Sequence, residues 1–197
     1  DDAYYEIRYT NQNPRSIVNI PGMKSRTVIL YTFSKKFAMT GWRLGASIGP
    51  SLIMKQIARF NINDESCTNH FIQHALAEVL NSRDDISMEI LDTLKLRRDL
   101  CLEILNGIKG IDIPKPESTF YLYPNISEIM LNKGYSDLDK FRVDVLKATG
   151  VSFCTRNHFG TPLSGEREKY IRLAYSGINR NDIKNGLNKF KHWVEQQ

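Results

Sequence analysis

The amino-acid sequence predicts an α/β protein that ends in a smaller α+β domain. Three observations lead to this prediction. In the first part of the chain, short apolar runs are followed by amphipathic helical patterns. A long helical segment, residues 84–105, comes next and is long enough to bridge two domains. After it the pattern changes to short strands mixed with helices, which is typical of an α+β domain.

The elements of the first part follow in chain order. Residues 1–7 predict a strand that runs into a loop, and residues 11–24, rich in Asn and Pro, predict a connecting loop. Two buried strands are predicted from short apolar runs, and helices are predicted where apolar residues recur at helical spacing. The strands are expected at 28–32 and 45–49, the helices at 51–60, 69–80 and 84–105, and a polar loop at 61–66.

The second part predicts an edge segment, three short strands and two helices. Asn179 or Asn181 is expected to cap the last helix, because Asn accepts a hydrogen bond from the first turn. The edge segment is expected at 110–114, the strands at 120–123, 151–153 and 170–175, and the helices at 136–149 and 181–195. The predicted domains are 1–83 for the larger domain, 84–107 for the linking helix and 108–197 for the small domain.

The composition is that of an ordinary globular protein. The formal net charge is +5, but basic residues are scattered among acidic ones, so a solvated mixed surface is favoured over a nucleic-acid site. A modest positive bias also favours anionic substrates and a phosphorylated cofactor. The 3 cysteines lie far apart, which argues against a disulfide framework or a metal site. No apolar run approaches membrane-spanning length, and a reduced, cytoplasmic setting fits.

The segment that carries most chemistry, residues 32–45, reads Thr-Phe-Ser-Lys-Lys-Phe-Ala-Met-Thr-Gly-Trp-Arg-Leu-Gly. It places a lysine pair directly after an apolar run. A lysine desolvated by aromatic neighbours can lose its proton and attack a carbonyl group. An arginine and hydroxyl groups nearby can hold a phosphate. Together these groups indicate a pyridoxal phosphate site, which needs both a reactive lysine and an anchored phosphate.

The run Ser-Lys-x-Phe-Ala-Met-Thr-Gly-Trp-Arg-Leu-Gly resembles the cofactor-lysine signature of class I/II aminotransferases, the aspartate aminotransferase-like enzymes of fold type I. The match is long and free of gaps. The resemblance implies a large domain with a mixed, mainly parallel sheet and flanking helices. It also implies that Lys35 forms the Schiff base with pyridoxal 5′-phosphate, because that lysine follows the serine directly. Chemistry alone does not choose between Lys35 and Lys36.

Asp2 and Tyr5 form a second pair of interest. A carboxylate beside the pyridine nitrogen keeps the ring protonated, and a phenol stabilises the ring's own oxygen. The order Asp-x-x-Tyr-Glu resembles the family's pair upstream of the lysine and assigns these two roles to Asp2 and Tyr5. The alternative is a frayed terminus.

Phosphate anchoring is assigned to Arg43 and Thr32. The family counterpart of Arg43 grips the phosphate, and Thr32, three residues before Lys35, matches a phosphate-binding hydroxyl position. Ser34 and Thr40 are further hydroxyls, for which ordinary turn or capping roles are equally favoured.

Arg172 stands alone in an otherwise apolar strand, and a buried arginine needs an anion. The partner is either a structural carboxylate or the α-carboxylate of an amino acid, held by two parallel hydrogen bonds. The resemblance to the family's Arg-Leu-(Ser/Ala)-(Phe/Tyr) strand favours the substrate carboxylate.

Two segments depart from the family pattern. Ser118 stands where Pro-x-Gly-x-Phe-Tyr has its glycine, and the common Pro-Gly-x-x-Phe-Gly lacks its Pro-Gly, although Phe159 and Gly160 are present. The second segment often borders the substrate, so side-chain specificity stays open. Arg156 and His158 either contact an acidic substrate side chain or lie in solvent.

The sequence therefore predicts an enzyme, a transaminase that moves an amino group between an amino acid and a 2-oxo acid. Two alternatives stay open. One is a fold type I lyase such as a C–S lyase, and the other is the aminotransferase-like sensing domain of a transcription regulator. The resemblance implies a homodimer. The scattered charges argue against a nucleic-acid partner, and the lack of a long apolar run argues against a membrane partner.

The resemblance covers only the later half of family members, so we expect the chain to correspond to their C-terminal half. The earlier half supplies an aromatic residue that stacks on the cofactor and a glycine-rich phosphate loop. The purified 197-residue chain alone is therefore expected to bind cofactor weakly and to show no turnover. An assay of amino-group transfer by this chain checks the expectation, and robust transamination would refute it.

Overall fold

The computed structural model describes residues 3–12, 15–82 and 86–196. The chain divides into two units, Asp1–Asp92 and Thr93–Gln197, and the division falls inside the helix α4 (Ile86–Asn106). We describe each unit by itself.

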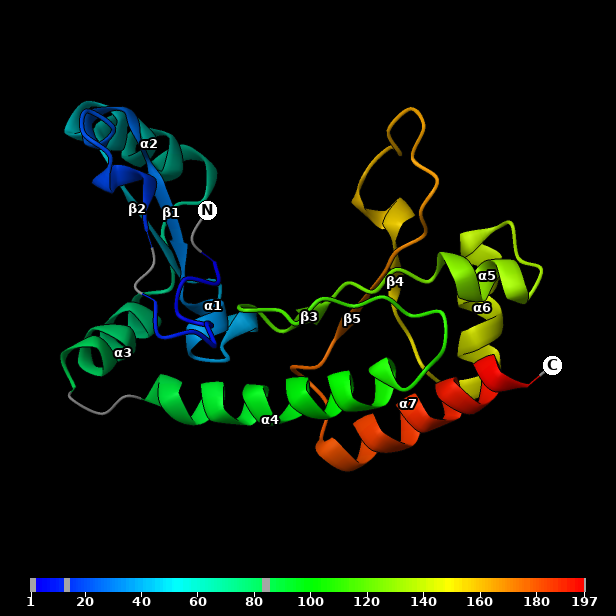
Figure 1. Cartoon of the computed structure of the whole chain (residues 1–197). Helices are drawn as coiled ribbons and strands as arrows, with labels where there is room; N and C mark the ends of the chain where they lie inside the picture. The colour runs from blue at the N-terminus through cyan, green and yellow to red at the C-terminus, as the bar shows by residue number, and fades with distance from the viewer. Residues whose placement is uncertain (1–2, 13–14, 83–85, 197) are drawn as a thin grey trace. The chain divides into compact units, whose positions relative to one another are not determined.

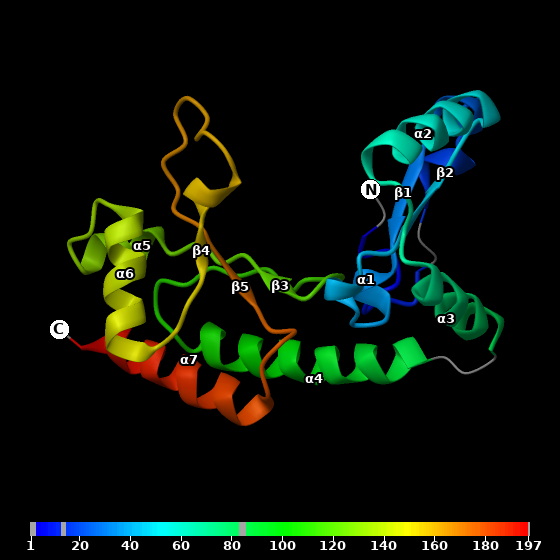
Figure 2. The ribbon, with the colours of Figure 1, turned by 180° about the vertical axis from the view of Figure 1, so that it is seen from behind.

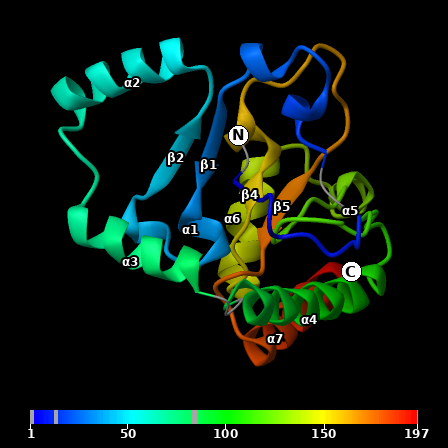
Figure 3. The same cartoon turned by 90° about the vertical axis from the view of Figure 1, so that its left-hand side faces the viewer.

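An antiparallel ribbon of β1 (Ile29–Thr32) and β2 (Gly45–Ile48) organises the first unit, as Figure 3 shows. Ile29 pairs with Ile48 and Thr32 with Gly45. The strands approach so closely that a Cβ atom on Gly45 would lie 2.8 Å from the carbonyl oxygen of Tyr31, so a side chain at this position would clash with the backbone. Both strands were expected to be buried, yet β2 is largely exposed within this chain.

Short helical turns and two longer helices complete the first unit (Figure 1). The short ones are η1 (Ile17–Asn19), η2 (Lys24–Arg26), α1 (Phe33–Lys36) and η3 (Thr40–Trp42). The longer ones are α2 (Ser51–Asp64) and α3 (His70–Asn81). A small apolar core of Leu44, Ile72 and Leu76 packs against Phe33, Phe37 and Met39. This core ties the segment that contains Lys35 to α3.

A three-stranded antiparallel sheet lies at the centre of the second unit. Its order is β3 (Tyr121–Leu122), β5 (Ile171–Ala174), β4 (Cys154–Thr155), so β5 is the middle strand. Figures 1 and 2 show α7 (Arg180–Glu195) running beside the later part of α4. The remaining helices are α5 (Ser127–Asn132), α6 (Leu138–Thr149) and the short η4 (Arg156–Phe159).

The second unit has the larger core of the two. Phe141 of α6 is fully buried, and its ring centroid lies 5.6 Å from that of Trp193 and 5.3 Å from that of Tyr135. The side chains buried to the same degree come from every layer of the unit: Leu105, Leu122, Ile126, Ile129, Val145, Ile171, Tyr175 and Phe190. Burial of such side chains contributes most of the favourable free energy of folding.

The predicted helices are found with small shifts at their ends. Asp137 accepts hydrogen bonds from the first turn of α6, and Gly150 ends that helix at a φ of 76°, where a residue without Cβ is favoured. Asn179, one of the two predicted caps, begins α7. The helix α2 is longer than predicted, because the polar residues after 60 continue it and the amide of Asn63 donates to the Arg59 carbonyl oxygen.

Three local predictions are wrong, and one helix was not predicted. Residues 3–6 form a turn instead of a strand, and β4 begins at Cys154 instead of at 151, because pairing with β5 sets its register. The predicted edge segment contributes a single bridge, Asp112 to Asn125. Finally, α5 was not predicted; its apolar Ile129 and Met130 bury against the core of the unit. All strand pairs among the described residues are antiparallel.

The packing of α4 predicts a difference between the cysteine thiols. Cys101 is buried, and burial raises its pKa to about 12, whereas Cys67 is exposed. At about pH 8 the thiolate is the reactive form, so iodoacetamide is expected to alkylate Cys67 and to leave Cys101 unmodified. Peptide mass spectrometry measures both, and guanidinium chloride should expose Cys101 as the control. Equal native rates for the two thiols would contradict the packing of α4.

Candidate cofactor and carboxylate site

Lys35 lies on α1, a single helical turn that begins where β1 ends. Thr32 caps this turn, because its hydroxyl oxygen accepts a hydrogen bond from the Ser34 N–H at 3.3 Å. Ser34 is buried, and Lys35 is half-buried beside it. Two predicted groups, Thr32 and Lys35, therefore share one turn at the end of a strand.

The neighbouring Lys36 has a different environment. Its Nζ lies 3.1 Å from Glu6 Oε1, and the Tyr31 hydroxyl donates to the same oxygen at 3.3 Å. The Nζ atom also lies 5.3 Å from the centre of the Phe37 ring. The Lys36 side chain thus ties α1 to the turn that contains Glu6.

Arg43 follows η3 with a φ of 55°, in the left-handed region that residues with a Cβ seldom adopt. This turn leaves the Arg43 side chain exposed while Leu44 enters the core. One guanidinium N–H group donates to the Thr40 carbonyl oxygen at 2.9 Å. Guanidinium has five N–H donors, so others remain to bind an anion. This contact uses the carbonyl oxygen of Thr40 and not its hydroxyl group.

The groups on residues 32–43 fit pyridoxal 5′-phosphate in their chemistry. Its aldehyde requires an amine, which Lys35 supplies, and its phosphate requires a fixed cation and hydroxyl donors. Arg43 supplies the cation, and the Thr32 hydroxyl can still donate its own proton while its oxygen caps α1. A hollow of about 580 Å³ adjoins Arg43 and Trp42 but does not include Lys35, so we do not identify it with the cofactor site.

Asp2 lies outside the described residues. Tyr5, its predicted companion, lies in the turn at 3–6 and is partly exposed. The next residue, Glu6, makes the ion pair with Lys36. This pair holds the turn next to α1.

Arg172 belongs to the second unit, where it lies in the middle strand β5 opposite Cys154. Its guanidinium carbon lies 4.3 Å from the centre of the Tyr121 ring and 4.5 Å from that of Phe159. Its Nη2 lies 3.9 Å from the sulfur of Cys154. Among the described residues no carboxylate pairs with Arg172. Of the two predicted partners, the structural carboxylate is therefore not found in this part of the chain.

Arg156 is half-buried and His158 is exposed, and both side chains make contacts within their own loop. Arg156 Nε lies 2.8 Å from Glu166 Oε1, and its Nη1 donates to the Gly160 carbonyl oxygen at 3.1 Å. His158 Nδ1 accepts the backbone N–H of Thr155 at 3.2 Å. Both side chains hold the loop in place. Sequence reasoning missed these roles, because the partner of Arg156 lies ten residues away in an irregular segment.

The sequence also gave no role to the two rings at Arg172. Phe159 was noted only as a surviving part of a motif, and Tyr121 only as part of a strand. The alternation of side chains along a strand and the motif Phe-Gly were the available signals. The ring contacts themselves depend on the pairing of β3 and β4 with β5, which no local pattern specifies.

Two negative observations apply to the described residues only. No group of three or more His, Cys, Asp or Glu side chains is arranged to hold a metal ion. None of the helices combines the length and the apolar character that crossing a membrane requires.

Solved structures place the fold among the fold type I aminotransferases. The aspartate aminotransferase from Rhizobium meliloti superimposes with a TM-score of 0.88 and 26% identity, covering 99% of this chain and 48% of that chain. The aromatic aminotransferase from Pyrococcus horikoshii OT3 gives a TM-score of 0.85 and 29% identity, covering 99% of this chain and 50% of that one. The predicted fold class is confirmed.

Sequence comparison is more specific. The model of the family "Aminotransferase class I and II" matches residues 1–190. The aspartate aminotransferase of Sulfolobus acidocaldarius is 31% identical over 195 residues, which are 99% of this chain and 47% of that protein. The chain therefore belongs to the class I and II aminotransferase family, whose members use pyridoxal 5′-phosphate. It spans about half the length of the curated relatives it matches.

The two lysines offer a matched pair of substitutions. In the full-length protein, Lys35→Ala should abolish the visible absorption of lysine-bound cofactor and lower turnover by about 10²–10⁴-fold, because the positioned amine is lost. Lys36→Ala should keep the absorption. Borohydride reduction followed by peptide mapping measures the attachment, and a trapped adduct on Lys36 in Lys35→Ala would show that the assignment is wrong.

Proposed function

We propose that the full-length protein is a pyridoxal phosphate-dependent transaminase that exchanges the amino group of an amino acid with a 2-oxo acid. The observation that carries the proposal is the segment 32–43, in which a reactive-amine candidate, Lys35, lies between two phosphate-binding candidates, Thr32 and Arg43. Family membership supports the same reaction class.

Each residue of the site is assigned a separate role in the reaction. When bound, the cofactor supplies an electron-accepting ring that stabilises negative charge at the substrate Cα. Lys35 Nζ holds the cofactor, then takes the Cα proton as general base and returns it as general acid. Thr32 and Arg43 hold the phosphate. Asp2 is assigned to the ring nitrogen and Tyr5 to the ring oxygen, as the motif implies.

Arg172 is assigned to the substrate α-carboxylate. The position of its guanidinium close to the Tyr121 and Phe159 rings supports this role, because cation–π contacts hold the group while its N–H donors can still bind an anion. The lack of an acidic partner among the described residues also supports it. The α-carboxylate is common to all amino acids, so Arg172 does not select the side chain.

Assembly and location are further parts of the proposal. We place the full-length protein in the cytoplasm as a homodimer. Large apolar side chains of the first unit, among them Leu52, Phe60 and Ile62 of α2, are exposed in this chain and are suited to contact with further protein. Some of the relatives are named for aspartate and for aromatic amino acids, so the donor is sought among these first.

Product analysis tests the reaction. Incubation of the full-length holoenzyme with an amino donor and a labelled 2-oxo acid is expected to give one new amino acid for each donor consumed, because the amino group is transferred and not released. Chromatography with mass detection measures the products. Pyruvate and ammonia from a sulfur-containing donor, without a new amino acid, would indicate a C–S lyase and overturn the proposal.

A further inference from the structure

The two rings beside Arg172 are held by different means. Tyr121 belongs to β3, and its N–H donates to the Thr119 hydroxyl at 3.2 Å. The Tyr175 hydroxyl donates to the Thr119 carbonyl oxygen at 3.1 Å, and Thr119 itself has a φ of 65°. Strand pairing and this turn therefore fix the Tyr121 ring within the sheet.

Phe159 has no such support from a strand. It is the last residue of η4, and 43% of its surface is exposed. Its ring centroid lies 6.5 Å from that of Tyr123, in an edge-to-face arrangement. A ring this exposed keeps a single position only when the backbone that carries it is fixed, so the position of η4 decides where Phe159 lies.

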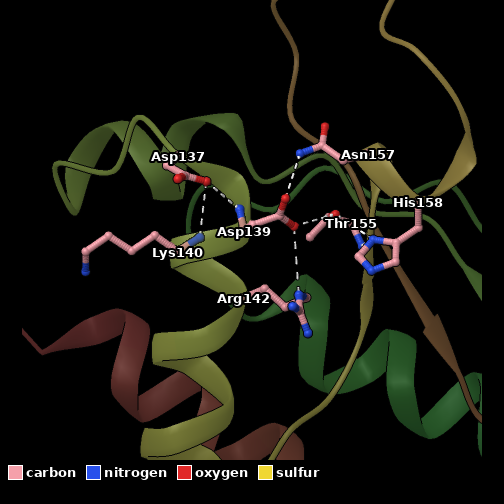
Figure 4. A network of polar contacts seen from close by, with 7 residues as sticks. All are labelled: Asp137, Asp139, Lys140, Arg142, Thr155, Asn157 and His158. Carbon is pink, nitrogen blue, oxygen red and sulfur yellow. Dashed lines mark hydrogen bonds and ion pairs between the residues drawn. The ribbon is translucent and has the colours of Figure 1, made fainter.

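A network of polar contacts fixes η4 at its start (Figure 4). Thr155 is fully buried, and its side chain lies 2.8 Å from His158 Nδ1 and donates to Asp139 Oδ1 at 3.1 Å. The amide of Asn157 donates to Asp139 Oδ2 at 3.2 Å. Figure 4 shows Thr155 between Asp139 and His158; its hydroxyl joins it to the first turn of α6, and its backbone N–H joins it to His158 of η4.

Charge strengthens this network at Asp139. The hydrogen bond from Asn157, the hydrogen bond from Thr155 and the positive charge of the nearby Arg142 hold the pKa of Asp139 below its ordinary value. Asp139 is therefore a carboxylate at neutral pH and accepts both hydrogen bonds as a charged group. The ion pair of Arg156 with Glu166 holds the far side of the same loop.

We propose that Asp139, Thr155 and His158 are positioning residues for Arg172. They fix η4 so that Phe159 lies against the Arg172 guanidinium, and the guanidinium then presents its N–H groups to a substrate carboxylate. The carboxylate part of this inference rests on the proposed function. The network stands at the segment where the family's Pro-Gly is replaced in this chain, and it supplies by side chains the rigidity that Pro would supply through its ring.

The positioning can be tested on the 197-residue chain without cofactor, through the reactivity of arginines with phenylglyoxal. Thr155→Val keeps the side-chain shape but removes the hydroxyl, so the rate at Arg172 should rise about fivefold, the factor that one hydrogen bond of ordinary strength represents. Thr155→Ser keeps the hydroxyl and should restore the original rate. Peptide mass spectrometry measures each arginine separately.

Arg98 serves as the internal control, because it is 3% exposed in the same unit and reacts only if the unit loosens. An unchanged rate at Arg172 in Thr155→Val, with Arg98 still protected, would overturn the proposal. Where Thr155→Val exposes Arg98 as well, Asp139→Asn decides, because it replaces one acceptor oxygen by a donor and leaves the core untouched. An unchanged Arg172 rate in that variant would also overturn the proposal.

Asp137→Asn is the matched control for Asp139→Asn. It removes the same charge two residues away, Asn caps helices as well as Asp does, and Asp137 contacts only the backbone of α6 in this network. The rate at Arg172 should therefore stay unchanged in this variant. Equal acceleration in both variants would assign the effect to charge alone and overturn the positioning role.

A kinetic comparison in the full-length enzyme links the positioning to the carboxylate. Thr155→Val should raise KM for the amino donor about fivefold with kcat nearly unchanged, because uniform binding is lost, whereas Arg172→Lys should raise KM further. A raised Arg172 reactivity with an unchanged KM would overturn the link to the substrate. Absence of transamination by the wild-type enzyme would instead contradict the proposed function and leave the reactivity result standing.

Discussion

The guanidinium group of Arg172 is the strongest constraint on the second unit. A charged group in the middle strand of a small sheet is destabilising unless its surroundings compensate for lost hydration. Here compensation comes from two aromatic rings, and cation–π contacts contribute about 0.5–2 kcal/mol each, depending on exposure. The rings come from segments on either side of β5, so the three-stranded pairing is required to bring them to Arg172.

The first unit satisfies a different constraint, because it must present a lysine at the end of a strand. The hydrogen bond from Ser34 to Thr32 turns the chain into α1 at that point. The left-handed turn at Arg43 then returns the chain to β2, and Gly45 allows the strands to approach. A left-handed residue with a Cβ costs about 1–2 kcal/mol, which the surrounding contacts of Leu44 offset. Lys35 and Arg43 therefore both lie in the short connection between β1 and β2.

The sequence predicted the parts of this structure that depend on local patterns. The helices α3, α4, α6 and α7 follow from apolar periodicity, and the cap Asn179 follows from side-chain chemistry. The α/β class came from the order of apolar runs and helical patterns, and the family came from one linear motif that contains Lys35. These features need no knowledge of which segments meet in space.

What the sequence did not predict depends on tertiary contacts. The ion pairs of Glu6 with Lys36 and of Arg156 with Glu166 join segments whose approach no local pattern encodes. The replacement of Pro-Gly before Phe159 left the side-chain specificity open in the sequence. In the structure Thr155 is fully buried and its hydroxyl donates a hydrogen bond to Asp139. We propose that this hydrogen bond restricts the backbone where Pro would restrict the φ angle through its ring. Rigidity based on side chains can be altered by single substitutions in α6, far along the chain from the ring it positions.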